Sequence, residues 1–241
     1  MNLLAIETSG HECGVALLAD GQVVAERRVA DPMQLLRNLT AEVVDLLAEG
    51  SISLRDIDVF AIDLGPGTFT GLRIGVMTAK AWAHILRKPL VGVCSLDVLA
   101  HAHGSKDAAT LTVVRSRFGT AYARIYSAGA VVAPADHGIA CADMAGVARL
   151  AADAGISAVR VVGDALARHT AELEAELAAL GVAATMGWSA APSPVDLAAL
   201  ASVRAAHGDF ADALAASPLY VAPPPARPNL RTGSSVAGTG G

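Results

Sequence analysis

Two short segments hold the residues best suited to chemistry. Residues 6–10 read IETSG and end an apolar run with one carboxylate and two hydroxyls. Residues 63–80 read DLGPGTFTGLRIGVMTAK, in which a glycine-rich turn stands between an apolar run and a helix-like one. The N–H groups of such a turn, at the positive end of a helix, can bind phosphate. The candidate phosphate contacts are therefore Glu7, Thr8, Gly67 and Thr68; the alternatives are a solvated strand end and a purely structural turn.

The glycine-rich turn matches neither common phosphate fingerprint. Counted from Gly65, a P-loop would need its Gly-Lys pair where Thr70 and Gly71 stand. The dinucleotide fingerprint would need a third glycine in place of Thr70. Pro66 also removes one N–H from any phosphate cradle. What remains is a generic anion site made by the N–H groups of the two residues after Pro66.

The helix that follows the turn has a stripe of small residues. Gly71, Gly75, Ala79 and Ala83 recur every four positions and would let another element approach closely. The helix is also apolar beside this stripe, so it is either a core element or a contact for a partner. In the partner alternative, leucines of the first long helix belong to the same surface. The candidate interface residues are Leu35, Leu39, Leu46, Gly71, Leu72, Gly75, Ala79, Trp82 and Ala83.

Composition and charge argue against several classes of protein. The 241-residue chain has a net charge of -5, whereas a nucleic-acid binder acting alone needs clustered Lys and Arg. Cys13, Cys94 and Cys141 are far apart and odd in number, which predicts buried thiols. No charge-free run of ~18 apolar residues occurs and no basic leader precedes the first apolar run, so we expect no membrane span and a cytoplasmic protein. No catalytic residue and no metal ligand are predicted.

Hydrophobic patterning predicts the same order of elements twice. In the first half, strands are expected at 3–8, 13–20, 22–30 and 59–65, with helices from 32 to about 50 and from the turn to about 87. A strand at 89–95 and a short helix at 96–103 follow. In the second half, strands are expected at 110–116, 121–127, 129–135 and 158–164, with helices at 144–155, 165–180 and 194–206.

This repeated βββαβα order predicts an α/β protein with the actin-like ATPase fold. We expect an N-terminal subdomain over 1–104, a smaller subdomain over 105–221 and a Pro/Gly-rich tail over 222–241 that is extended or disordered. In this fold, nucleotide binds between the halves, and a carboxylate at the first hairpin holds a metal-bound water. Glu7 stands at that position, although a fold alone does not give a function.

The segments LLAIETS and GPGTFTGLRIGV (65–76) resemble the bacterial TsaB family, formerly called YeaZ. PLVGVCSLDVLA (89–100) also fits the family pattern. The resemblance implies a non-catalytic scaffold in the synthesis of N6-threonylcarbamoyladenosine at position 37 of tRNA. It further implies pairing with the catalytic TsaD-type transferase through the first two long helices, a TsaE-type ATPase that joins the complex, and a homodimer when the chain is alone. ATP or ADP would bind at most at the partner interface, and tRNA would be contacted only through the complex.

The sequence departs from the family pattern at the start of the first helix, in the tail after Tyr220 and at two positions that bear on chemistry. Glu7 replaces the usual aspartate, and Arg115 stands where the second half usually carries an aspartate. A cation in place of that carboxylate argues against independent ATP hydrolysis. The rival hypothesis is an actin-like ATPase or small-molecule kinase acting alone, with Glu7 and Asp63 as carboxylates beside the metal.

Overall fold

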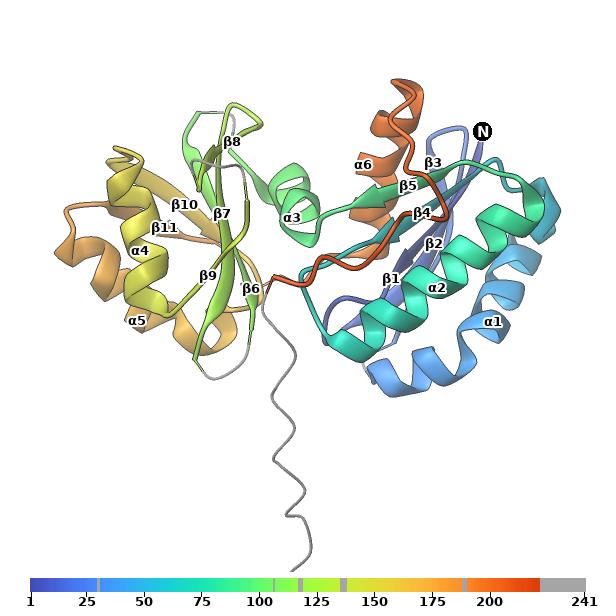
Figure 1. The fold of residues 1–241 in the computed structure, drawn as a ribbon, viewed down its shortest axis with the longest axis horizontal. Coiled ribbons are helices and arrows are strands. Elements are labelled where there is room, and N and C mark those ends of the chain that lie inside the picture. The colour runs from blue at the N-terminus through green and yellow to red at the C-terminus, as the bar shows by residue number, and fades with distance from the viewer. Residues whose placement is uncertain (30, 106, 117–118, 135–137, 188–189, 222–241) are drawn as a thin grey trace, which may run out of the picture.

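The structure is a computed structural model. It describes residues 1–221 except 30, 106, 117–118, 135–137 and 188–189, so the predicted tail at 222–241 lies outside the described residues. Two α/β lobes lie side by side, each built on a mixed sheet (Figure 1).

The first lobe follows the predicted order of strands and helices. Its sheet has the strand order β3-β2-β1-β4-β5, in which β1, β4 and β5 run parallel and β1, β2 and β3 pair antiparallel. The elements are β1 (Asn2–Glu7), β2 (Cys13–Ala19), β3 (Gln22–Val29), α1 (Pro32–Glu49), a 3-10 turn (Leu54–Asp56), β4 (Val59–Asp63), α2 (Phe69–Leu86), β5 (Leu90–Val93) and α3 (Ser95–His103).

The second lobe repeats this plan more completely than the sequence indicates. Its strand order is β11-β10-β6-β7-β8, and β9 pairs with β7. The short strands β9 and β11 were not predicted, because both are only partly buried and show no apolar run. The elements are β6 (Ala109–Arg115), β7 (Ala121–Ser127), β8 (Ala130–Ala133), β9 (Ala140–Ala142), α4 (Met144–Asp153), β10 (Ala158–Val162), α5 (Leu166–Ala179), β11 (Ala183–Met186) and α6 (Pro194–Ala206).

Local signals in the sequence set several of these boundaries. Asp20 and Gly21 both have positive φ, as a two-residue hairpin turn between β2 and β3 requires. Asp31 caps α1 by accepting a hydrogen bond from the Met33 N–H, and Pro32 occupies the first helical position. These predictions are confirmed, because each depends on residues close together in the chain.

Two helices pack across the boundary predicted between the subdomains. Helix α6 packs on the first sheet, against β1, β2, β4 and β5, whereas α3 packs on β6, β7 and β10 of the second lobe (Figure 1). Each lobe therefore contributes its last helix to the other lobe. The apolar side of α6 is buried against Leu3, Ala5 and Ala16, so this helix is part of the core of the first lobe. The division of the chain into 1–104 and 105–221 stays a prediction.

The first sheet is buried on both faces. Alternate residues of β1 and β4, such as Leu4 and Phe60, face α1 and α2, while their neighbours face α6. This explains why β4 reads as a nearly continuous apolar run. No helix within the described part of the chain is long and apolar enough to cross a membrane.

Helix α2 lies unusually close to the end of β1. A Cβ added at Gly71 would stand 2.0 Å from the Thr8 carbonyl oxygen, and one added at Gly75 would stand 2.0 Å from the Thr8 hydroxyl oxygen. The small-residue stripe is therefore the side of α2 that packs on the sheet. Of the two alternatives left open by the sequence, the core alternative describes these residues.

We predict that Gly71→Ala lowers the free energy of unfolding by about 1–3 kcal/mol, because the added methyl group must displace backbone. The loss should occur although alanine favours a helix by about 1 kcal/mol over glycine. Urea denaturation measures it. The control Ala81→Ser, at an exposed position of the same helix, should change stability by less than about 0.5 kcal/mol. An unchanged midpoint for Gly71→Ala would contradict the packing described here.

Candidate functional site

The candidate chemical residues come together at the carboxyl ends of β1 and β4. These two strands are parallel neighbours, so Glu7 at the end of β1 and Asp63 at the end of β4 lie at the same edge of the sheet. Both side chains are fully buried. The glycine-rich turn and the start of α3 cover the two carboxyl groups. The cluster therefore connects the ends of β1 and β4 with the turn and with α3.

Glu7 is held in an environment that favours its protonated form. Its Oε1 accepts hydrogen bonds from the Ser9 N–H at 2.7 Å and from the Ser9 hydroxyl at 2.6 Å. Its Oε2 is buried and has no hydrogen-bond partner among the described residues. Burial, followed by the negative charge of Asp63, raises the pKa of Glu7 well above its usual value.

Asp63 ties three segments together. Its Oδ1 accepts hydrogen bonds from the Gly65 N–H at 2.6 Å and from the Ser95 hydroxyl at 2.7 Å, and its Oδ2 lies 3.2 Å from the Ser9 hydroxyl. Burial raises the pKa of Asp63, and these donors oppose the rise. The Ser9 hydroxyl has one hydrogen but faces both carboxyl groups. It cannot donate to both at once, so a proton on one carboxyl group would relieve the contact, and burial together with the charge of Asp63 favours that proton on Glu7.

The glycine-rich turn packs directly on the first hairpin. The Thr68 N–H donates to the Ser9 carbonyl oxygen at 2.7 Å, and a Cβ at Gly67 would stand 2.2 Å from that oxygen. The structure thus brings together the four residues named as candidate phosphate contacts, Glu7, Thr8, Gly67 and Thr68. They contact one another, however, and a phosphate would have to replace the Thr68–Ser9 hydrogen bond. Phosphate binding stays a prediction.

Arg115 at the end of β6 has a local partner. Its backbone N–H and its guanidinium Nε donate to the two carboxylate oxygens of Asp164, at 2.8 and 3.0 Å. Asp164 follows β10, which is the counterpart of β4 in the second lobe. The cation that replaces the usual aspartate therefore pairs with a carboxylate at the corresponding edge of the second sheet.

The residues predicted to face a partner mostly face the chain's own core. Trp82 is half-buried, with its ring centroid 6.3 Å from that of Phe60, and both stripe glycines are buried. These side chains are at most 3% exposed: Leu35, Leu39, Leu46, Leu72, Ala79 and Ala83. The exposed sides of α1 and α2 lie opposite most of these residues.

Comparisons with known proteins agree on one family. The family model described as TsaD, tRNA N6-adenosine threonylcarbamoyltransferase, matches residues 33–186. The Escherichia coli tRNA threonylcarbamoyladenosine biosynthesis protein TsaB is 36% identical over 124 residues, which cover 51% of this chain and 53% of that protein. A Pseudomonas aeruginosa crystal structure, described as similar to peptidase YeaZ, superposes with a TM-score of 0.73 at 26% identity and covers 92% of this chain and 99% of that one.

The chain belongs to the TsaB family. The match spans about half the length of the curated TsaB relative. A ROK hexokinase from Thermus thermophilus superposes with a TM-score of 0.54 at 10% identity, covering 86% of this chain and 100% of that one, and shows the shared fold alone. The predicted actin-like ATPase fold is therefore confirmed.

The sides of α1 and α2 that face away from the sheet carry exposed apolar side chains in this TsaB-family chain. Large apolar side chains are exposed there: Met33 and Val44 on α1, and Phe69, Met77 and Ile85 on α2. Sequence reasoning missed them because it followed the small-residue stripe. The available signal was the spacing of Met77, Ala81 and Ile85, which recur every four positions on the other side of the helix.

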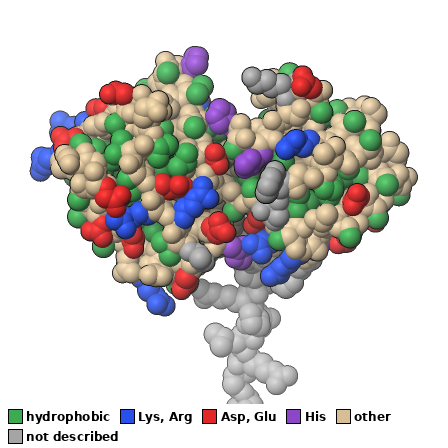
Figure 2. Space-filling view, turned by 180° about the vertical axis from the view of Figure 1, so that it is seen from behind, with side chains coloured by type: hydrophobic (Ala, Val, Ile, Leu, Met, Phe, Trp, Pro, Cys, Tyr) green, Lys and Arg blue, Asp and Glu red, His purple; other side chains and the backbone are tan. Residues whose placement is uncertain are grey.

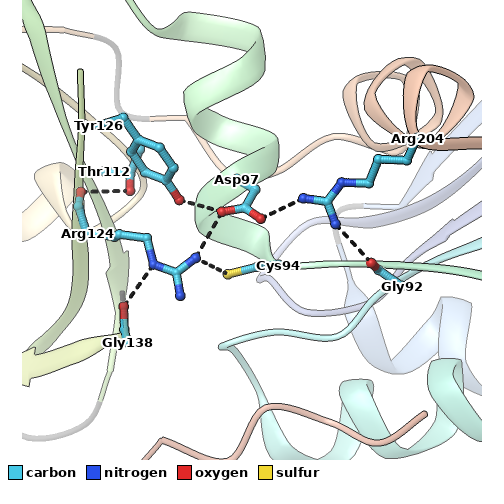
Figure 3. A network of polar contacts seen from close by, with 8 residues as sticks. All are labelled: Gly92, Cys94, Asp97, Thr112, Arg124, Tyr126, Gly138 and Arg204. Atoms are coloured by element: carbon cyan, nitrogen blue, oxygen red, sulfur yellow. Dashed lines mark hydrogen bonds and ion pairs between the residues drawn. The ribbon is translucent and has the colours of Figure 1, made fainter. Parts of the chain in front are cut away.

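A polar network that the sequence did not reveal joins the two lobes. Asp97 of α3 accepts hydrogen bonds from Arg124 at 3.0 Å and from the Tyr126 hydroxyl at 2.6 Å, both on β7. Its other oxygen accepts from Arg204 of α6 at 2.8 Å, and Arg204 also donates to the Gly92 carbonyl oxygen of β5 (Figure 3). One carboxylate thus connects both sheets and both exchanged helices.

This network borders a groove between the lobes. Charged and histidine side chains gather along it in the view from behind (Figure 2). A hollow of about 690 Å³ there is lined by Asp97, His101, Tyr126 and Arg204 among others. Burial and the charge of Asp97 raise the pKa of Tyr126, so its hydroxyl stays a proton donor.

The buried carboxyl cluster predicts a specific pH dependence. Because the pKa of Glu7 is raised on folding, the native state keeps a proton that the unfolded chain loses above about pH 4.3. Stability should therefore fall as pH rises above about 4.3 and through the raised pKa of Glu7. Glu7→Gln, which is neutral at every pH, should remove this part of the slope in urea denaturation at each pH.

Glu12→Gln, which changes an exposed carboxyl group on the loop that follows Glu7, is the matched control and should keep the wild-type slope. Parallel profiles for the wild type and Glu7→Gln would mean that Glu7 is ionised in the native state.

Loss of Asp97 should weaken the joint between the lobes. Asp97→Ala leaves two partly buried guanidinium groups without their carboxylate, and we expect a loss of about 2–3 kcal/mol in unfolding free energy. Glu174→Ala, on the exposed side of α5, should change it by less than about 0.5 kcal/mol. Equal denaturation midpoints for the two variants would show that the network does not hold the lobes together.

Proposed function

We propose that this chain is the non-catalytic scaffold subunit of the complex that forms N6-threonylcarbamoyladenosine at position 37 of tRNA. The observation that carries the proposal is the exposed apolar surface on α1 and α2. Met77 is 62% exposed and Ile85 is 73% exposed, so water contacts most of two large apolar side chains on one helix. Large apolar side chains exposed on one side of a helix favour a site of protein association.

The proposed partner is a TsaD-type transferase. The family model that matches residues 33–186, which include both helices, is that of the transferase. A transferase with the same fold has a corresponding pair of helices, and the two pairs can bury their apolar sides against each other. The same surface would support a homodimer when the partner is absent.

Further members of the complex follow from the family. We propose that a TsaE-type ATPase joins the pair, that ATP or ADP binds at most at the partner interface, and that tRNA is contacted only through the complex, in the cytoplasm. The net charge of -5 supports an indirect contact with tRNA. The rival hypothesis of an independent ATPase or kinase gains no support from Glu7 and Asp63, because both are fully shielded from solvent.

Two surface variants test the proposal directly. Met77→Asp and Ile85→Asp place a charge on the proposed interface and should abolish co-purification with a TsaD-type partner. They should also abolish restored tRNA modification in a reconstituted mixture. Val203→Asp is the matched control, because Val203 is 49% exposed on α6, which covers the opposite face of the same sheet.

Thermal melts should show all three variants folded, since each substitution is at an exposed position. If the wild-type chain neither binds the partner nor supports modification, the proposed function is wrong.

A further inference from the structure

The segment that follows α6 runs back across the first lobe beside α2 (Figure 1). We call residues 207–221 the C-terminal strap. Near its start, the Ala211 N–H donates to the Leu90 carbonyl oxygen at 2.8 Å, and the two residues form an antiparallel bridge on β5. Near its end, the Leu219 N–H donates to the Leu64 carbonyl oxygen at 2.7 Å. Because Leu90 follows α2 and Leu64 precedes it, the strap runs antiparallel to that helix.

The middle of the strap is fixed by one side chain of α2. The Lys80 ammonium group donates to the Leu214 carbonyl oxygen at 2.9 Å and to the Ala216 carbonyl oxygen at 2.6 Å. The side chains of Ala213 and Ala216 pack on the core beneath α2. The strap is therefore anchored at both ends and in the middle, and its inward side chains are small enough to lie flat on the core.

The outward side of the strap is apolar and exposed. Leu214 is 67% exposed and Tyr220 is 53% exposed. Residues 213–221 carry no charged side chain, so water meets an apolar surface there. The centroid of the Tyr220 ring lies 5.4 Å from the centroid of the Phe69 ring, at the start of α2. The strap thus extends the exposed apolar surface of α2 sideways, at Leu214 near Lys80 and at Tyr220 near the start of the helix.

Two hollows interrupt this combined surface. One of about 530 Å³ lies between the last turn of α2 and the strap, lined by Ala83, His84, Ile85, Arg87 and Ala213. The other, of about 340 Å³, lies at the first turns of α2, lined by Phe69, Thr70, Arg73, Ile74 and Met77. Hollows beside exposed apolar side chains can receive the protruding side chains of a partner's helix.

We propose that the C-terminal strap forms one rim of the partner surface, and that the TsaD-type partner contacts Leu214 and Tyr220 together with α2. Lys80 is the positioning residue, because it holds the strap in register with the helix. This inference rests on the proposed function. It adds that the partner binds the strap as well as α1 and α2.

The affinity of the full chain for a TsaD-type partner tests this, measured by calorimetry. Leu214→Asp and Tyr220→Asp should each weaken binding at least about tenfold, with unchanged thermal melts because both positions are exposed. Val203→Asp should bind as the wild type does. In hydrogen exchange, the partner should slow exchange of amides in residues 213–221 of the wild-type chain.

The positioning role of Lys80 has its own readout. Lys80→Ala should speed exchange of the Ala211 and Leu219 amides in the free chain and should weaken partner binding as well. Lys80→Arg keeps donors for the two carbonyl oxygens and should restore slow exchange and binding. Faster exchange with unchanged affinity would show that the strap is ordered by Lys80 but not used in docking.

The outcomes separate the two proposals. If Met77→Asp abolishes binding while both strap variants bind normally, the strap inference is wrong and the proposed function stands. If the strap variants alter only self-association, the strap serves a second copy of this chain and the inference is also wrong. If the wild-type chain does not bind the partner, both proposals fail.

Discussion

The contact between α2 and the end of β1 is the constraint on which the rest of the first lobe depends. Gly71 and Gly75 leave no side chain between the helix and Thr8, so the helix axis comes close to the sheet. This approach places the glycine-rich turn on the first hairpin, where the Thr68 N–H reaches the Ser9 carbonyl oxygen. It also closes the space around Glu7 and Asp63, which is why two carboxyl groups are buried together.

The same contact decides which side of α2 is available to other molecules. With the small residues turned inward, Met77 and Ile85 point outward, and Lys80 lies where it can anchor the strap. A turn that resembles a phosphate loop thus fixes the orientation of a helix with an exposed apolar side. The Thr68 N–H of this turn is already hydrogen-bonded to the Ser9 carbonyl oxygen, so a ligand would have to compete for it.

The two lobes are joined by an exchange of helices and by one carboxylate. Helices α3 and α6 each pack on the sheet of the other lobe, and Asp97 holds cations from both sides. Motion between the lobes would have to disturb buried apolar contacts and a charged network together. The joint therefore favours a fixed relation between the lobes.

The sequence by itself determined the α/β class, the order of most elements and the family. Helix caps, hairpin turns and apolar periodicity depend on residues close together in the chain, and the motif from Gly65 to Val76 is a local pattern as well. Only the tertiary structure decided which side of α2 faces the sheet, where α6 packs and what Asp97 binds. These features depend on residues that are distant in sequence and meet only when both lobes are folded. Periodicity shows that a helix has an apolar side, but it does not say whether that side meets the chain's own sheet or another protein.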